Sequence, residues 1–306
     1  MRHAYLILAH DSWEQLRLLV SLLDHPQNDL YIHIDKKVKV FDERALTGAA
    51  RFSSITVLRR HAIYWGSYEM TAAELTLLSH ARARGYDYYH LLSGADLPLK
   101  TQDEIHQFFD RNKGSEFVQV KARGDRLHPE VQRRAKVYHV FHNLRFLKVP
   151  GILRRLFTLL DKGCMALQLA LGVDRMRKYP ELSLCTGSQW FSITDALAAH
   201  LLNHQTLIRK LFRMTSCSDE LFVQTLTENS PFRDAVYPGG NLRFIRWAKG
   251  RNPHPRLLTQ QDAPLLKDSD CLFARKFSLA QDPDLVYMIA DRARPRSDLY
   301  NSALQK

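Results

Sequence analysis

Polar side chains that can bind a ligand follow apolar runs at four points of the sequence. They are His10-Asp11, Asp35-Lys36, Trp65-Gly66 and the stretch Ser93–Asp96. In open α/β sheets, ligands bind outside the carboxyl ends of the strands. If the apolar runs are parallel strands, these polar groups meet along one edge of one sheet. The sequence therefore predicts a site for a polar ligand at that edge.

The segments that must position these residues alternate between strand and helix patterns. Strand-like runs cover residues 3–9, 29–35, 54–58 and 88–92. One helical pattern follows His10-Asp11 and extends to residue 23, and a second covers residues 68–84. Thr101, followed by Glu104, gives the capping box of a further helix. Such alternation favours an α/β fold with a mostly parallel, doubly wound sheet. Further on, residues 182–193 look like two strand-like runs with a turn at Gly187.

The charge of the chain favours an anionic partner. Its 306 residues include 44 Lys and Arg against 32 Asp and Glu, which gives a net charge of +12. A phosphorylated small molecule, a membrane surface and nucleic acid would all suit this charge. Nucleic acid is disfavoured because the aromatic residues lie mainly in strand-like runs instead of on a basic face.

Basic and apolar residues alternate in a helical pattern between residues 144 and 178. Such helices either pack on the core while their Arg and Lys reach solvent, or lie on an anionic membrane surface. No apolar run approaches the roughly 20 residues of a membrane span. The chain opens directly into a strand pattern instead of a signal peptide. Four widely spaced cysteines favour reduced thiols, so we expect a cytoplasmic protein, with peripheral contact at the inner face of the membrane as the alternative for the basic segment.

Six motifs, in order, resemble glycosyltransferase family 14, the family of core-2/I-branching β-1,6-N-acetylglucosaminyltransferases and peptide O-xylosyltransferases. They are Asn28–Lys37, Trp65-Gly66, Leu92–Lys100, Gly187–Trp190, Asp219–Leu226 and Leu272–Phe277. Each motif alone is weak, but the ordered set is specific and covers nearly the whole chain, with residues 121–180 the least similar. The resemblance implies a GT-A-like, Rossmann-like fold, a UDP-sugar donor, inversion at the anomeric carbon and no obligatory metal. The few cysteines and the lack of an anchor and stem look like a bacterial member.

The resemblance assigns catalysis to Glu220, which matches the general base that takes the proton of the acceptor hydroxyl. Taken alone, Asp219 and Glu220 would only complement the positive end of a helix capped by Ser218. A helix N-terminus would weaken Glu220 as a base, and burial or the neighbouring Asp219 would have to offset that effect.

The resemblance also places two cations at the leaving diphosphate. Arg275 and Lys276 match the family's diphosphate-binding pair, and fixed cations can replace a metal there. Arg256 is a third candidate. The two D-x-D strings, 268–270 and 282–284, follow no strand of the first half, so we expect neither a metal site nor a cofactor.

The remaining site residues are expected around the two substrates. For the nucleotide they are His10, Asp35 and Trp65, and for the donor sugar or acceptor they are Asp96, Gln189, Trp190 and Asp219. A turn role for His10 and core packing for Trp190 are the structural alternatives.

We expect one domain over residues 1–306, with a nucleotide-sugar half (1–120), a variable basic helical segment (121–180) and an acceptor and catalytic half (181–306). The expected partners are a UDP-sugar and a glycan or lipid-linked acceptor. N-acetylglucosamine is the favoured donor sugar and xylose the alternative. A non-catalytic, basic membrane-associated module is the second alternative.

Overall fold

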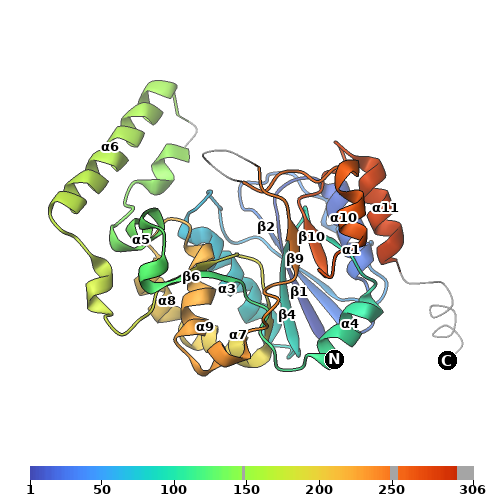
Figure 1. Cartoon of the computed structure of the whole chain (residues 1–306). Coiled ribbons are helices and arrows are strands. Elements are labelled where there is room, and N and C mark those ends of the chain that lie inside the picture. Colours follow the sequence, from blue (N-terminus) through green and yellow to red (C-terminus); the bar gives the residue numbers. More distant parts are fainter. Residues whose placement is uncertain (147–148, 249–253, 295–306) are drawn as a thin grey trace, which may run out of the picture.

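The fold is built on a five-stranded sheet, described by a computed structural model over residues 1–146, 149–248 and 254–294 (Figure 1). The strand order is β3-β2-β1-β4-β8. The strands are β1 (His3–Ala9), β2 (Asn28–Ile34), β3 (Ile55–Leu58), β4 (Tyr88–Ser93) and β8 (Ser192–Thr194). The first four are parallel and β8 runs antiparallel to β4. The predicted α/β fold with a mostly parallel sheet is thereby confirmed.

Helices cover both faces of this sheet. One face carries α1 (Trp13–Leu23), α4 (Gln102–Arg111), α10 (Ala263–Lys267) and α11 (Pro283–Ala293). The other carries α3 (Tyr68–Arg82), α7 (Asp195–Asn203), α8 (Gln205–Phe212) and α9 (Phe222–Glu228). In β1, Tyr5 and Ile7 pack into the first cluster, and Leu6 and Leu8 into the second. Because strand side chains alternate between faces, a strand covered on both sides is apolar throughout.

Two smaller sheets join distant parts of the chain. The first has the order β5-β10-β9 and consists of β5 (Leu97–Pro98), β10 (Phe273–Arg275) and β9 (Arg243–Ile245). The second pairs β6 (Val120–Arg123) with β7 (Cys185–Gly187). Since β5 follows β4 directly, β10 brings the motif at 272–277 beside the motif at 92–100.

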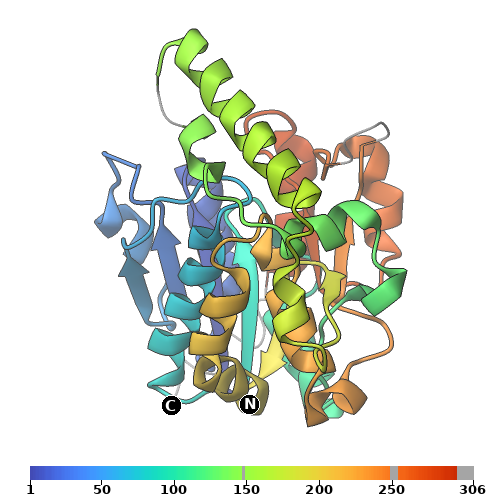
Figure 2. The ribbon, with the colours of Figure 1, turned by 90° about the vertical axis from the view of Figure 1, so that its left-hand side faces the viewer.

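Residues 121–180 are mainly helical, as predicted, although the segment opens in strand β6. Its helices are α5 (Pro129–Lys136) and α6 (Gly151–Ala170), with 3-10 turns at Gly124–Arg126, His142–Phe146 and Arg175–Lys178. Residues 147–148 lie outside the described part of the chain. Helix α6 lies at the periphery of the molecule, outside the layers that flank the sheet (Figure 1, Figure 2). None of the helices in the described residues is both long and apolar enough to cross a membrane.

Gly187 is the last residue of β7 and not the centre of a turn. It pairs with Val120, and a Cβ at this position would lie 1.7 Å from the carbonyl oxygen of Gln119. Only glycine therefore permits this approach of β6 to β7. All four cysteine thiols are free, in agreement with the prediction.

Candidate active site

The segment that carries Asp219 and Glu220 is a short 3-10 turn, Ser218–Glu220, immediately before α9. It is attached to the loop before α3, because the Cys217 amide donates to the Gly66 carbonyl over 2.8 Å. Gly66 has a φ of 69°, and a Cβ there would lie 3.1 Å from the Cys217 sulfur. The Trp65-Gly66 motif thus permits close packing that positions the two carboxylates.

Ser218 does not cap a helix, so the structural alternative of a capped helix N-terminus is wrong. Its hydroxyl is hydrogen-bonded to Thr71 Oγ1 at 2.8 Å, and the turn has no side-chain cap. A favourable interaction with the positive end of a capped helix therefore does not explain why Asp219 and Glu220 stand at these positions.

Glu220 is a partly exposed carboxylate beside a cation. Its side chain is 42% exposed, and Arg134 Nη1 lies 3.4 Å from Oε2. Burial raises the pKa of Glu220, while Arg134 and then Lys121 oppose that rise. A carboxylate with a raised pKa that solvent can still reach has the properties of a general base.

Glu220 belongs to a cluster of three acids, of which the sequence predicted Asp219 but not Glu74. Glu74, on α3, is fully buried, and its Oε1 accepts from Gln189 Nε2 over 2.8 Å. Burial, and secondly the charge of Asp219, raises the pKa of Glu74 well above its usual value. Burial, and secondly Glu220, raises the pKa of Asp219 to about 7. The cluster therefore avoids carrying three full negative charges at neutral pH.

Glu74 had a signal in the sequence. It lies on the apolar stripe of its helix, one turn from both Thr71 and Leu78, where a charged residue is unusual. Its oxygen Oε2 is buried without a hydrogen-bond partner among the described residues. Gln189, predicted for the sugar or acceptor, instead contacts Glu74.

The variant Glu74→Gln should gain stability relative to wild type as the pH rises. The raised pKa of Glu74 favours folding fully only below the unfolded value of about 4.3, and this contribution is lost as the pH rises toward the folded value. Glutamine keeps the acceptor for Gln189 but does not titrate. We expect an advantage on the order of 1 kcal/mol at about pH 8 and little at about pH 5. Thermal unfolding at both pH values measures the difference in stability between the variant and wild type, with exposed Glu181→Gln as control. An equal difference at both pH values would contradict the prediction.

A second group of predicted site residues is centred on Arg275, which contacts Asp96 and Trp190. Arg275 Nε lies 3.6 Å from Asp96 Oδ1, and the guanidinium carbon is 3.9 Å from the centroid of the Trp190 ring. Asp96 is buried and accepts from the hydroxyl and the amide of Ser93 at 2.6 and 3.0 Å. Asp96 thus holds Arg275 in place. Trp190 is 8% exposed and packs in the core, so its stacking partner is Arg275.

Lys276 follows Arg275 and is exposed. Its carbonyl accepts from the Leu258 amide over 2.8 Å, which places the segment of Arg256 alongside. The Arg256 guanidinium is paired in bidentate fashion with Asp262, with one contact of 2.9 Å. Arg256 therefore has a structural partner, whereas Lys276 presents its ammonium group to solvent.

The residues predicted for the nucleotide lie toward the carboxyl edge of the sheet. Asp35 is buried at the end of β2, and its Oδ1 accepts from the Lys37 amide over 2.8 Å. His10 Nε2 lies 3.3 Å from Asp11 Oδ2, and both side chains are 70% exposed. Trp65 is 69% exposed. Because β1, β2 and β4 are adjacent and parallel, His10, Asp35 and Asp96 follow neighbouring strands, as the motif positions predicted.

The acids of the D-x-D strings do not gather into a metal site in the described residues. No group of three or more His, Cys, Asp or Glu side chains there could hold an ion. Asp282 instead caps α11 by accepting from the Leu285 amide over 3.0 Å. Independence of a metal remains a prediction.

Comparison with known proteins identifies relatives of the chain. Residues 3–263 match the family model Branch: Core-2/I-Branching enzyme. Xylosyltransferase 1 of Homo sapiens is 25% identical over 257 residues, which cover 81% of this chain and 24% of the relative. Xylosyltransferase 2 of Canis lupus familiaris is 24% identical over 259 residues, which cover 81% of this chain and 27% of the relative. The chain thus spans about a quarter of the length of these curated relatives.

Two solved structures have lower similarity. Apo mouse xyloside xylosyltransferase 1 matches with a TM-score of 0.34 and 11% identity, over 76% of this chain and 82% of that one. Core-mannan synthase A from Aspergillus fumigatus, in its Mn/GDP form, matches with a TM-score of 0.34 and 10% identity, over 75% and 70%. The family match covers most of the chain and includes five of the six motifs, all except Leu272–Phe277. The chain belongs to the Core-2/I-Branching enzyme family.

Proposed function

We propose that the protein is an inverting glycosyltransferase that moves a sugar from a UDP-sugar to an acceptor hydroxyl. The observation that carries this proposal is Glu220, a half-exposed carboxylate with a raised pKa beside Arg134, in a family of enzymes. Its neighbours, the buried Glu74 and the partly exposed Asp219, have raised pKa values of their own. Because 42% of its side chain is exposed, Glu220 is the member of the acid cluster that an acceptor can reach.

In the proposed reaction, Glu220 takes the proton of the acceptor hydroxyl while the oxygen attacks the anomeric carbon. The bond to the diphosphate breaks with its electron pair, UDP leaves, and the configuration at the anomeric carbon inverts. The negative charge that grows on the diphosphate is stabilised by Arg275 and Lys276 in place of a metal. The pairing of Asp96 with Arg275 orients that cation before the substrate binds.

The proposal also covers the identity of the donor sugar. UDP-N-acetylglucosamine is our candidate from the motifs. UDP-xylose is the second, because several relatives of the chain are named xylosyltransferases.

A thermal-shift and calorimetric panel tests the function. It compares UDP, UDP-N-acetylglucosamine, UDP-xylose, UDP-glucose and GDP-mannose, each with and without chelator. The proposal expects selective stabilisation by one UDP-sugar that persists in chelator. Stabilisation that requires manganese would contradict the role of the two cations, and no response to any nucleotide would favour a non-catalytic binding module.

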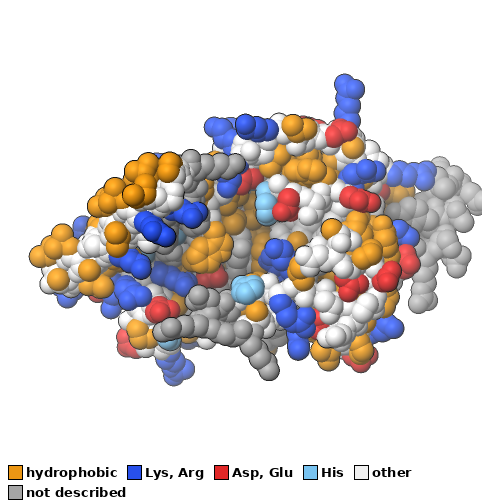
Figure 3. Space-filling view, turned by 90° about the horizontal axis from the view of Figure 1, so that it is seen from above, with side chains coloured by type: hydrophobic (Ala, Val, Ile, Leu, Met, Phe, Trp, Pro, Cys, Tyr) orange, Lys and Arg blue, Asp and Glu red, His pale blue; other side chains and the backbone are white. Residues whose placement is uncertain are grey.

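We also propose that α6 contacts an anionic membrane that carries a lipid-linked acceptor. Four apolar side chains at spacings of one or two turns face away from the body: Ile152, Leu156, Leu159 and Leu167, with 78%, 48%, 65% and 60% of their surface exposed. Figure 3 shows hydrophobic side chains gathered at the end of the molecule where α6 lies. The opposite side of α6 packs inward through buried Asp161. Exposed Arg155 and Lys162 flank the apolar face and suit anionic headgroups.

The double variant Leu156→Ser, Leu159→Ser should lose binding to anionic vesicles. Each serine removes apolar area worth roughly 1.5–3 kcal/mol when buried in lipid, so we expect at least about a tenfold loss. Co-sedimentation with phosphatidylglycerol vesicles at low and high salt measures it. Leu265→Ser, at an equally exposed position on α10, is the control. Absence of wild-type binding at low salt would exclude the contact.

A further inference from the structure

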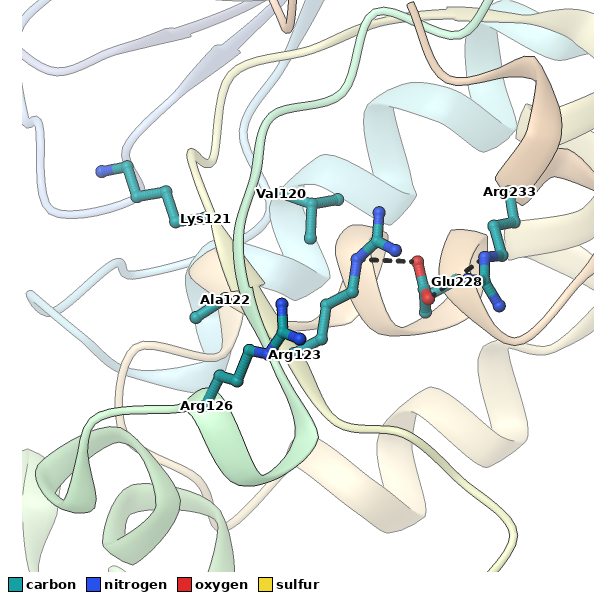
Figure 4. A pocket seen from close by; sticks show the side chains of 7 residues that line it. All are labelled: Val120, Lys121, Ala122, Arg123, Arg126, Glu228 and Arg233. Atoms are coloured by element: carbon teal, nitrogen blue, oxygen red, sulfur yellow. Dashed lines mark ion pairs between the residues drawn. The ribbon is translucent and has the colours of Figure 1, made fainter. Parts of the chain in front are cut away.

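A hollow of about 620 Å³ lies beside β6 and has a strongly basic lining (Figure 4). The residues that line it are Val120, Lys121, Ala122, Arg123, Arg126, Glu228 and Arg233. Four cations thus surround one carboxylate. A second hollow, of about 370 Å³ between α1 and α2 (Glu43–Thr47), instead has Arg17 against Glu14 and Asp42. The excess of positive charge is therefore a property of the hollow beside β6 and not of both.

Two of the cations are held in fixed positions. Arg123 Nε lies 3.2 Å from one oxygen of Glu228, and Arg233 Nε lies 3.4 Å from the other (Figure 4). The Glu228 side chain is only 7% exposed, so this carboxylate is a buried anchor. Because it offsets one charge, three remain for a ligand. Guanidinium groups fixed in this way suit planar carboxylate and phosphate groups.

The hollow is close to Glu220. Lys121 lines it and is also one of the two cations that lower the pKa of Glu220. At the other end, α9 runs from the residue after Leu221 to Glu228, a rise of about 10 Å at 1.5 Å per residue. The Thr186 hydroxyl, on the strand paired with β6, donates to the Glu220 carbonyl over 3.3 Å. The same strand pair therefore carries the hollow and contacts the proposed base.

An exposed aromatic ring adjoins the hollow. Lys121 Nζ lies 4.8 Å from the centroid of the Trp247 ring, and Trp247 is 44% exposed. Aromatic rings present an apolar face on which the C–H side of a sugar packs. A cation beside such a ring suits a saccharide that carries a negative charge.

We propose that this hollow is an acceptor subsite for an anionic sugar unit, one that bears a carboxylate or phosphate group. The proposal rests on the proposed glycosyltransferase function and adds the chemical class of its acceptor. The charged unit binds among Lys121, Arg123, Arg126 and Arg233, while another part of the same acceptor presents the hydroxyl that Glu220 deprotonates. None of these cations belongs to the motif at 272–277 that supplies the proposed diphosphate site.

The test compares a charged oligosaccharide with its neutral counterpart. Tetragalacturonate and its fully methyl-esterified form share one skeleton, and titration at low salt reports the binding of each. We expect wild-type protein to bind the charged form and to lose that binding in the ester or at high salt. Arg126→Glu should weaken it by about tenfold or more, since it reverses an exposed charge in the lining. Arg44→Glu, an equally exposed change on α2 (Glu43–Thr47), should have no effect.

A second pair of ligands, glucose 6-phosphate and glucose, separates phosphate from carboxylate recognition; binding of either charged ligand that Arg126→Glu weakens supports the subsite. Equal binding by wild type and Arg126→Glu, or no binding of any charged ligand, would overturn it. Displacement of the bound ligand by UDP would also overturn it, because the hollow would then belong to the donor. UDP binding is measured in parallel: its absence alone would count against the glycosyltransferase function and leave the anion site standing.

Discussion

Glu220→Gln should abolish sugar transfer and leave the dissociation constant for UDP within a few-fold of wild type. Glutamine fills the same volume beside Arg134 but cannot accept the proton of the attacking hydroxyl. General-base catalysis contributes about 10²–10⁴-fold, and the loss should fall in kcat. Initial rates with the donor identified by the nucleotide panel, together with calorimetry of UDP, measure both quantities.

Glu181→Gln, an exposed change outside the acid cluster, provides the matched control for Glu220→Gln. Its rate should equal that of wild type. Full activity of Glu220→Gln would remove this residue from the mechanism. A large loss of UDP affinity in the same variant would instead indicate a role in holding the donor.

Lys276→Ala should weaken UDP binding and lower kcat together. An exposed ammonium group that contacts the diphosphate interacts with the ground state and more strongly with the departing UDP, whose charge is greater. We expect about a tenfold rise in the dissociation constant and a further loss in kcat. Calorimetry of UDP and initial rates separate the two effects.

Lys267→Ala removes an equally exposed lysine on α10 and should change neither value. Lys276→Arg keeps the charge and should recover part of the binding. An unchanged dissociation constant in Lys276→Ala would show that the cation contacts no diphosphate. Arg275 is less suitable for this test, because its removal would also leave Asp96 buried without its ion partner.

The elements that were predicted correctly depend on local sequence. The strand at 3–9 is apolar at every position because helices cover it on both faces, and its observed bounds are the same. The capping box at Thr101 also forms as predicted, with the Thr101 amide 2.8 Å from Glu104 Oε2. Both features need only a few neighbouring residues, so their pattern is visible in one short stretch.

The predictions that failed depend on partners far along the chain. Ser218 bonds to Thr71 instead of capping a helix, and β6 is a strand because β7 pairs with it across more than 60 residues. The buried Glu74, whose Oε1 accepts from Gln189 far along the chain, was not predicted at all. Local periodicity carries no information about such tertiary partners.

The contact at Gly187 also restricts how the molecule can move. With the Gln119 carbonyl against the bare Cα of Gly187, β6 and β7 have no room to slide past each other without breaking their pairing. Proteins that close around substrates do so by hinges or by shear between packed elements, and shear between β6 and β7 is not available at this position. Any change of shape that accompanies turnover should therefore move the two strands together, and with them the part of the basic hollow that β6 lines.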